Sequence, residues 1–546
     1  MTWPPRFSLS TRRNFLKHIS AFAVYGAVLL PDLDAQDTKF VIAETASGKV
    51  RGVENNGIKI FKGIPYGADT SGANRFMAPA ERADWGGVRD ALEYGYSAPQ
   101  RDPSAPPPRT SSEMPAEGED CLVLNVWTPA LGDTFRKRPV MVWCHGGGFG
   151  SGSGSSPGTD GTNLARRGDV VVVTLNHRLN VLGFANLSEF SPDFAVSGDA
   201  GMLDIVQALK WVRTNISQFG GDPNTVTVFG QSGGGRKVET LLAMPSAKGL
   251  FHRAIVESGA AIKVTDRDVA VRNGEQLLAK LGVEKKNVRS LQTLSVEKIM
   301  AAYFAVAKDT PAMDASLLFS PTVDGKILPQ HPFSPKASPV SADVPLMIGS
   351  TRTEMTAFFQ NDPSAFSLSE TEMRARVTGL LGGQATSMIA LYQKLNPQAS
   401  PSDIYFLIAS DCRYGAPTMI IAQRRAALGK GPVYLYYFTW ETPVQGGRLR
   451  SPHTIEIPFA FDNVQISARM TGGGADAMAL ADKVSDAWIA FARTGDPNTP
   501  KLPHWPVYDL QDRATMVINS VSKVVNDPLR EQRLAMFQAL NLTEEN

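Results

Sequence analysis

Three stretches in the first third of the chain are apolar at nearly every position, and they limit the fold more than any other feature. They span residues 121–127, 139–144 and 169–175. A strand with one face in water alternates apolar and polar residues, whereas a strand covered on both faces is apolar throughout. The three stretches therefore predict strands inside a sheet that has helices on both faces.

The rest of the chain continues the alternation of helices and strands that such a sheet requires. Residues 200–219 have apolar side chains at helical spacing, and a β-branched stretch follows at 225–229. Further strand candidates lie at 345–349 and 433–439, and further helix candidates at 268–305, 370–395 and 412–428. This order predicts an α/β fold with a mostly parallel, twisted sheet. We interpret the later helical stretches as insertions that roof the sheet.

No linker rich in proline, glycine and serine separates parts of residues 36–546, so they are predicted to form a single domain. The first 35 residues hold four of the 55 basic and two of the 53 acidic residues, and the remainder has no net formal charge. A neutral body lacks the basic surface that binds nucleic acids or anionic membranes. We therefore expect no nucleic-acid partner.

Residues 1–35 have the pattern of a targeting segment. Arg12 and Arg13 precede an apolar run at residues 19–30. At ~1.5 Å per residue this run is too short to cross a bilayer core of ~30 Å as a helix. The segment is similar to a bacterial twin-arginine signal, which implies export of a folded protein and removal of the signal. We expect a periplasmic or secreted protein without a stable membrane anchor, whose partners include the twin-arginine export machinery.

The cysteines predict neither a disulfide framework nor a metal site. There are three, Cys121, Cys144 and Cys412, and their spacing is not that of metal ligands. The sequence also has no H-E-x-x-H motif. We therefore expect no metal and no other cofactor, and a fold stabilised by a large core.

Two serines match the pattern G-x-S-x-G, and their contexts differ. Ser232 follows the β-branched stretch 225–229 and precedes an apolar helix candidate at 238–244. This strand–turn–helix context is that of a nucleophile elbow, in which glycines permit a sharp turn. Ser156 lies in a loop of alternating glycine and serine with no strand before it. Ser232 is therefore the predicted nucleophile.

A serine needs a base to take its proton, and the base in turn needs an acid. Glu354 follows the strand candidate 345–349 after a short turn, whereas Asp324 precedes that strand and ranks lower. In the order nucleophile, acid, base, only His453 and His504 remain as bases. Prolines on both sides of His504 indicate a structural turn, and His453 lies in a loop after the last strong strand. Glu354 and His453 are the predicted acid and base.

Three consecutive glycines follow His145, at the end of the apolar stretch 139–144. Without Cβ atoms, their N–H groups can converge on a substrate oxygen. This is the HGGG-type motif that supplies an oxyanion hole beside a nucleophile elbow.

These motifs together resemble the type-B carboxylesterase family of α/β hydrolases, which includes relatives of the cholinesterases and of para-nitrobenzyl esterase. The resemblance covers nearly all of residues 38–540 and is carried by residues 119–126, 145–149, 176–184, 208–216 and 219–224 and by the turn at Ser232. It implies an α/β-hydrolase fold whose helical insertions cover the active site. It also implies ester hydrolysis through a Ser-His-Glu triad and an acyl-enzyme intermediate.

The resemblance assigns further residues one by one. The family's oxyanion donors map onto the backbones of Gly147, Gly148 and Gly233. Ser258 matches a serine near the acid and base, although a buried structural serine fits the same position. Gln231 and Gly233 depart from the usual G-E-S-A-G elbow, so a buried negative charge beside the nucleophile is missing. This departure argues against choline esters.

The sequence leaves the substrate open within this chemistry. A small-molecule carboxylic ester is the expected substrate, and the same machinery could act on amides, carbamates or lactones. A catalytically inactive, cholinesterase-like binding module is the alternative from another class. The complete set of candidate catalytic residues argues against it.

Overall fold

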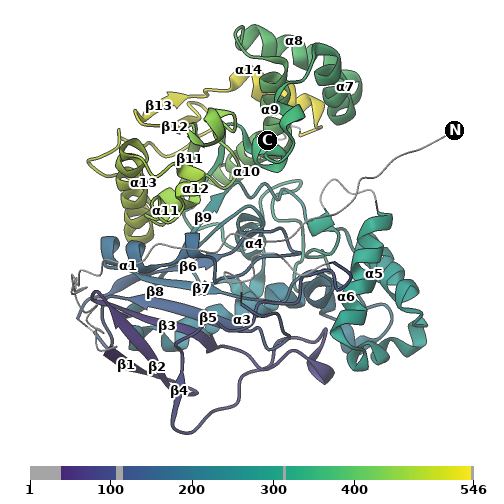
Figure 1. Ribbon diagram of the computed structural model, residues 1–546, viewed down its shortest axis with the longest axis vertical. Helices are drawn as coiled ribbons and strands as arrows, with labels where there is room; N and C mark the ends of the chain where they lie inside the picture. Colours follow the sequence, from purple (N-terminus) through teal and green to yellow (C-terminus); the bar gives the residue numbers. More distant parts are fainter. Residues whose placement is uncertain (1–38, 106–114, 134, 311–314, 543–546) are drawn as a thin grey trace, which may run out of the picture. The chain divides into compact units, whose positions relative to one another are not determined.

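A central sheet runs through the protein and orders all other elements around it (Figure 1). The computed structural model describes residues 39–105, 115–133, 135–310 and 315–542. In this part of the chain the sheet has 13 strands, in the order β1-β2-β3-β5-β7-β6-β8-β9-β10-β11-β12-β13, and β4 pairs with β2. The seven strands from β6 to β12 run parallel to one another. The predicted α/β fold with a mostly parallel sheet is therefore confirmed.

The strands are β1 (Lys39–Thr45), β2 (Gly48–Asn55), β3 (Ile58–Pro65), β4 (Val88–Asp90), β5 (Val123–Thr128), β6 (Arg138–Cys144), β7 (Val171–Leu175), β8 (Gly221–Gln231), β9 (Arg253–Glu257), β10 (Leu346–Thr351), β11 (Val433–Phe438), β12 (Ala514–Ile518) and β13 (Lys523–Asn526). The α-helices are α1 (Thr162–Gly168), α2 (Asn180–Phe184), α3 (Ala200–Asn215), α4 (Gly233–Leu241), α5 (Arg267–Leu281), α6 (Val296–Asp309), α7 (Glu370–Leu381), α8 (Ala385–Leu395), α9 (Pro401–Ser410), α10 (Ala416–Ala426), α11 (Ile457–Ala460), α12 (Ala468–Thr471), α13 (Ala475–Thr494) and α14 (Arg530–Ala539).

The central strands are buried on both faces, which explains why they are apolar throughout. In β6, Val140 and Val142 point into one hydrophobic cluster, together with side chains of α3 and α4. Met141 and Trp143 point into a second cluster on the other face, together with side chains of α1 and α13. Successive side chains of a strand face opposite ways, so each face of β6 needs its own apolar set.

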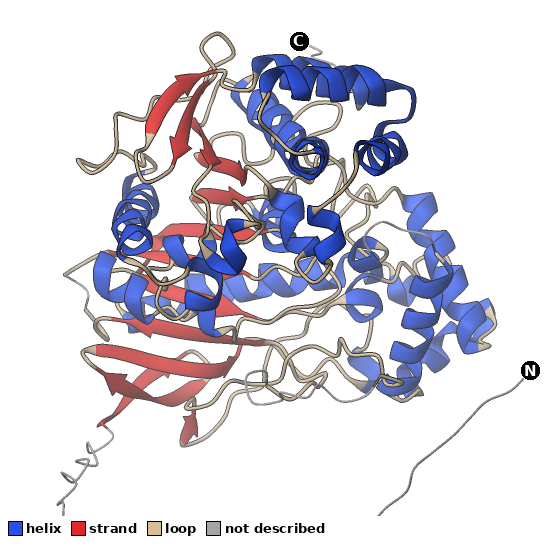
Figure 2. Ribbon diagram, turned by 45° about the horizontal axis from the view of Figure 1, so that its top comes forward, coloured by secondary structure: helices blue, strands red, loops and turns tan. Residues whose placement is uncertain are grey.

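A third hydrophobic cluster joins the helices α7 to α10 and α14. These helices form one group at the top of Figure 1, and Figure 2 shows the same group from another side. A single turn of π-helix, Asp411–Gly415, connects α9 to α10. A 3-10 helix, Glu354–Phe359, follows β10 after a short turn and contacts α9. The insertion therefore lies next to the carboxyl ends of β10 and β11.

Several predicted boundaries shift by a few residues. β8 begins at Gly221 rather than at residue 225, and α3 ends at Asn215, where a 3-10 turn continues to Phe219. The described residues from Lys39 onward form one compact unit. Within them, no helix combines the length and apolarity that crossing a bilayer requires. The predicted signal at residues 1–35 lies outside the described residues.

Candidate active site

Ser232 occupies the sharp turn between β8 and α4. Its backbone has φ 59° and ψ −122°, a conformation that a residue with a side chain rarely adopts. Its N–H donates to the carbonyl of Glu257 at 2.8 Å, which anchors the turn to the end of the neighbouring strand β9. The side chain is half-buried. Local geometry is thus that of a nucleophile elbow.

The glycines around Ser232 let the elbow pack directly on the loop that follows β6. A Cβ atom at Gly234 would lie 1.9 Å from the carbonyl oxygen of Cys144. A Cβ atom at Gly233 would lie 2.2 Å from the carbonyl oxygen of Gly148 and 2.4 Å from its nitrogen. Backbone touches backbone here, so no side chain fits between them.

Residues 145–149, here called the glycine loop, leave the carboxyl end of β6 beside the elbow. Gly147 and Gly148 have φ angles of +87° and +61°, which glycine adopts without strain. Among the described residues, no hydrogen-bond acceptor engages the N–H groups of these two glycines. Gly147 is exposed. Together with Gly233, the first residue of α4, they offer backbone donors next to Ser232.

Glu354 and His453 form a buried pair at the same edge of the sheet. Oε2 of Glu354 pairs with Nδ1 of His453, and their side chains are 0% and 5% exposed. The other carboxylate oxygen, Oε1, accepts from the N–H of Thr351 at 2.7 Å and from Oγ of Ser258 at 2.6 Å. The pair fixes Nδ1 as the protonated nitrogen in the neutral ring, so Nε2 is left to accept a proton.

Gln231 places the imidazole of His453 next to the elbow. Its Nε2 lies 3.3 Å from Nδ1 and 3.4 Å from Nε2 of His453. Since Nδ1 already donates to Glu354, the amide N–H group can donate only to Nε2. Within the described chain, Oγ of Ser232 makes no hydrogen bond to His453. Gln231 precedes Ser232 in the chain and contacts His453, which pairs with Glu354, so these four residues lie in one neighbourhood.

A second buried carboxyl group lies behind Glu354. Oε1 of Glu456 is 3.1 Å from Oγ of Ser258. Burial, reinforced by the negative charge of Glu354, raises the pKa of Glu456 well above its usual value. A protonated Glu456 can donate to Ser258, whose own hydroxyl then donates to Glu354. Ser258 therefore contacts Glu354 and is also fully buried, so both alternatives for this serine stay open.

Two aromatic rings cover the imidazole from the side of the helical insertion. The ring centroid of Tyr414, in the π-helical turn, is 4.8 Å from that of His453, and the centroid of Phe358 is 5.2 Å away. Phe358 is 56% exposed. The insertion therefore contributes directly to the surroundings of His453, as expected for helices that cover an active site.

The aspartate and the histidines that were not chosen as acid or base lie in other surroundings. Oδ1 of Asp324 accepts three backbone N–H groups, from residues 326–328, and so holds a turn. His504 is exposed. His145 and His177 stack on each other with centroids 5.0 Å apart, and burial lowers the pKa of His145 to about 3. Burial lowers the pKa of His177 as well. Both rings stay neutral at physiological pH.

Sequence reasoning missed Glu456 and Lys237. Glu456 lies three residues after His453, a spacing that could have signalled a place on the same short turn. Lys237 lies on α4 and is fully buried. Only its position between Gly235 and the apolar end of α4 hinted at burial.

In the described ranges, no group of three or more His, Cys, Asp or Glu side chains is arranged so that it could hold a metal ion.

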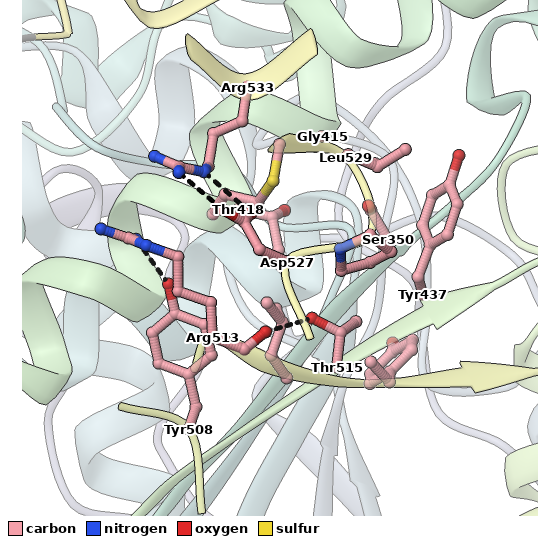
Figure 3. A pocket seen from close by; sticks show the side chains of 14 residues that line it. Ser350, Gly415, Thr418, Tyr437, Tyr508, Arg513, Thr515, Asp527, Leu529 and Arg533 are labelled. Carbon is pink, nitrogen blue, oxygen red and sulfur yellow. Dashed lines mark hydrogen bonds and ion pairs between the residues drawn. The ribbon is translucent and has the colours of Figure 1, made fainter. Parts of the chain in front are cut away.

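A cavity between β11, β12, α10 and α14 contains none of the predicted site residues (Figure 3). Its polar groups pair with each other: Arg533 with Asp527 at 2.8 Å, and Arg513 with Tyr508 at 3.0 Å. The glycine loop and the elbow remain the candidate site.

Known proteins resemble this chain over nearly its whole length. Residues 39–537 match the Carboxylesterase family. Para-nitrobenzyl esterase of Bacillus subtilis is 38% identical, over 91% of this chain and 98% of its own. Phenmedipham hydrolase of Pseudarthrobacter oxydans is 34% identical, again over 91% of this chain and 98% of its own. The crystal structure of a Geobacillus stearothermophilus carboxylesterase superimposes with a TM-score of 0.79 at 36% identity, and covers 91% of this chain and 99% of that one.

Proposed function

Because the chain belongs to the carboxylesterase family, and is therefore a carboxylic ester hydrolase, we propose that Ser232, His453 and Glu354 form its catalytic triad. The buried pair of Glu354 and His453 next to a strained serine turn is the observation that carries this proposal. The substrates are small-molecule esters.

In the proposed reaction, Oγ of Ser232 attacks the ester carbonyl carbon while Nε2 of His453 takes the hydroxyl proton. Glu354 stabilises the resulting imidazolium. The tetrahedral intermediate collapses when the carbon–oxygen bond of the ester breaks, and His453 gives its proton to the departing alcohol. Water then repeats the sequence on the acyl-serine and releases the acid.

The negative charge on the carbonyl oxygen needs donors that are already in place. We assign this role to the N–H groups of Gly147, Gly148 and Gly233; the backbones of Gly148 and Gly233 are in contact beside Ser232, and Gly147 precedes Gly148 in the glycine loop. One such donor contributes ~10²–10³ in rate. The mechanism also requires Oγ of Ser232 to turn toward Nε2. Catalytic hydrogen bonds often close in this way only when substrate binds.

Replacing the nucleophile tests the proposal, and the chain provides a matched control. Ser232→Ala should lower kcat for p-nitrophenyl acetate by at least ~10⁴-fold, with the circular dichroism spectrum unchanged. Ser156→Ala removes the serine of the second G-x-S-x-G pattern and should leave kcat unchanged. Turnover that survives Ser232→Ala, or a wild-type protein without turnover, would refute the proposed mechanism.

The same site could act on amides, carbamates or lactones, and the similarity to a phenmedipham hydrolase keeps this alternative open. A matched pair of p-nitrophenyl acetate and p-nitroacetanilide distinguishes esters from amides. We expect kcat/KM to be higher for the ester by several orders of magnitude. An equal value for the two compounds would favour the alternative.

A further inference from the structure

Lys237 is a buried cation directly beneath the glycine loop. It lies four residues after Gly233 on α4, so both residues are on the same face of the helix. That face is the one whose glycines touch the backbones of Cys144 and Gly148. The side chain of Lys237 is 0% exposed.

The ammonium group of Lys237 binds two carbonyl oxygens of the glycine loop. Nζ donates to the carbonyl of His145 at 2.9 Å and to that of Gly148 at 2.8 Å. It also lies 5.4 Å from the ring centroid of Phe149. One side chain thus holds the loop at its beginning and near its end.

These two carbonyls belong to the peptide units that flank the proposed oxyanion donors. Each peptide unit is a rigid plane that contains the carbonyl of one residue and the N–H of the next. The carbonyls of His145 and Gly148 therefore fix the units 145–146 and 148–149. The N–H groups of Gly147 and Gly148 belong to the two units between them. Each of these two units also has hydrogen bonds of its own: the carbonyl of Gly146 lies 2.8 Å from Nδ1 of His145, and the carbonyl of Gly147 accepts from the N–H groups of Gly150 and Ser151. Lys237 adds the contacts that hold the units on either side of them.

We propose that Lys237 is a positioning residue for the oxyanion site, because it clamps both ends of the glycine loop and so aims the N–H groups of Gly147 and Gly148. This inference rests on the proposed function of Ser232 and extends it. Lys237 does not contact the reacting atoms; it acts through the loop.

A role in filling space does not explain why a lysine occupies this buried position, because an apolar side chain would fill the same volume without a desolvation cost. Among the described residues, no carboxylate lies within ion-pair distance of Lys237; Cys144, His145 and His177 are the titratable groups around it. Burial without a carboxylate is unfavourable for an ammonium ion, and it lowers the pKa of Lys237 to about 7. The strong charge-assisted hydrogen bonds to the loop are the compensation that the structure provides.

Lys237→Met tests the clamp, since methionine retains much of the volume without any donor. For p-nitrophenyl acetate we expect kcat to fall about 10²-fold while KM changes less than about threefold. A trifluoromethyl ketone forms a hemiketal oxyanion on the serine, so its inhibition constant should rise by the same factor as kcat falls. A role in folding alone would leave both quantities unchanged.

Arg425 offers a matched control near the amino-terminal end of β10, away from the carboxyl ends of the strands where the candidate site lies. It is also a buried cation that donates to two loop carbonyls, those of Ser341 and Val344, ahead of β10. Arg425→Met should lower the melting temperature but keep kcat and the inhibition constant within about twofold of wild type. If Lys237→Met does not fold, Lys237→Gln replaces it, because the amide keeps donors but loses the charge and the reach.

The outcomes separate this inference from the proposed function. Turnover that survives Ser232→Ala overturns the proposed function. Wild-type kcat and inhibitor affinity in Lys237→Met, or in Lys237→Gln, overturn the clamp alone. A rise in KM at constant kcat also overturns it, because the loop would then bind ester and transition state equally.

Discussion

At the scale of single residues, Gly233 departs from the alanine usual in the family, and the structure gives the reason. An added Cβ atom would lie 2.2–2.5 Å from three backbone atoms of Gly148. Gly233→Ala should therefore push the glycine loop away from Ser232. We expect kcat for p-nitrophenyl acetate to fall 10-fold or more, since misplacing an oxyanion donor is costly.

Gly379 provides the control for this substitution. It lies on α7, where an added Cβ atom meets no other atom within 4 Å. Gly379→Ala should keep kcat and stabilise the helix by about 0.5–1 kcal/mol. Unchanged turnover in Gly233→Ala would mean that the loop has room to move without loss of alignment.

The residues of the proposed triad could be predicted from the sequence because their pattern indicates their chemistry. Ser232 lies between a β-branched stretch and a helix, and His453 and Glu354 follow it in the order that α/β hydrolases share. Lys237 could not be found in this way, because a lysine on a helix is normally exposed. Its burial depends on the glycines before it and on the loop packed against them. Glu456 was missed because only packing places it behind Ser258.

At the scale of elements, the π-helical turn Asp411–Gly415 places Tyr414 against the imidazole of His453. A π-turn is one extra residue in an α-helix, and such turns are frequent at functional sites. Deleting Cys412 should restore a continuous helix from α9 to α10 and rotate Tyr414 away from the ring. We expect kcat to fall about 10-fold because the imidazole loses its packing.

The measurement for this deletion combines steady-state kinetics with thermal unfolding. Little change in melting temperature together with lower kcat supports the role of the turn in placing His453. Deleting one residue from the exposed end of α14, such as Gln538, would test whether a shortened helix alone has this effect. Equal losses of kcat in the two deletions would contradict the role of Tyr414.

The sequence predicts interior elements better than irregular ones. Residues 139–144 are apolar because both faces of β6 are covered, and this cause is visible in the residues themselves. The π-turn leaves no comparable pattern, since one inserted residue hardly alters apolar periodicity. Similarly, the start of β8 was missed, because Gly221 pairs with Arg138 of β6 and the polar residues 222–225 after it lie in a register shift before regular pairing resumes at Val226.

At the scale of the whole molecule, buried carboxyl groups make the folding free energy depend on pH. Glu257 is fully buried, and only Oε1 accepts a hydrogen bond, from Nε1 of Trp488 at 2.7 Å. Burial raises the pKa of Glu257 to about 7 from its ordinary 4.5. The folded protein thus keeps a proton that the unfolded chain releases. This contribution to stability is complete below about pH 4.5 and is lost as pH rises through 7.

Glu257→Gln removes this titration, and urea unfolding between pH 4 and 8 measures the consequence. The stability of wild type relative to Glu257→Gln should decrease by about 3 kcal/mol between pH 4.5 and pH 7, and then level off. Glu239 has a pKa that burial likewise raises to about 7, so Glu239→Gln should behave in the same way. A difference that stays constant with pH, or that grows, would contradict this assignment.

The location of the whole protein is a separate proposal, which rests on the paired arginines near its beginning. We propose that the twin-arginine machinery exports the protein to the periplasm or beyond. Replacing Arg12 and Arg13 by lysine keeps the charge but removes the pair, so esterase activity should shift to the cytoplasmic fraction. Arg6→Lys is the control and should leave the distribution unchanged. An identical distribution for both variants argues against this route.

None of the three cysteines forms a disulfide. Cys121, Cys144 and Cys412 are all free, and the first two are sealed inside the core. No covalent crosslink has to form before the polypeptide reaches its final shape, so neither an oxidant nor an isomerase is needed. A protein without disulfides can reach its native fold in a reducing compartment, as the proposed export of a folded protein requires.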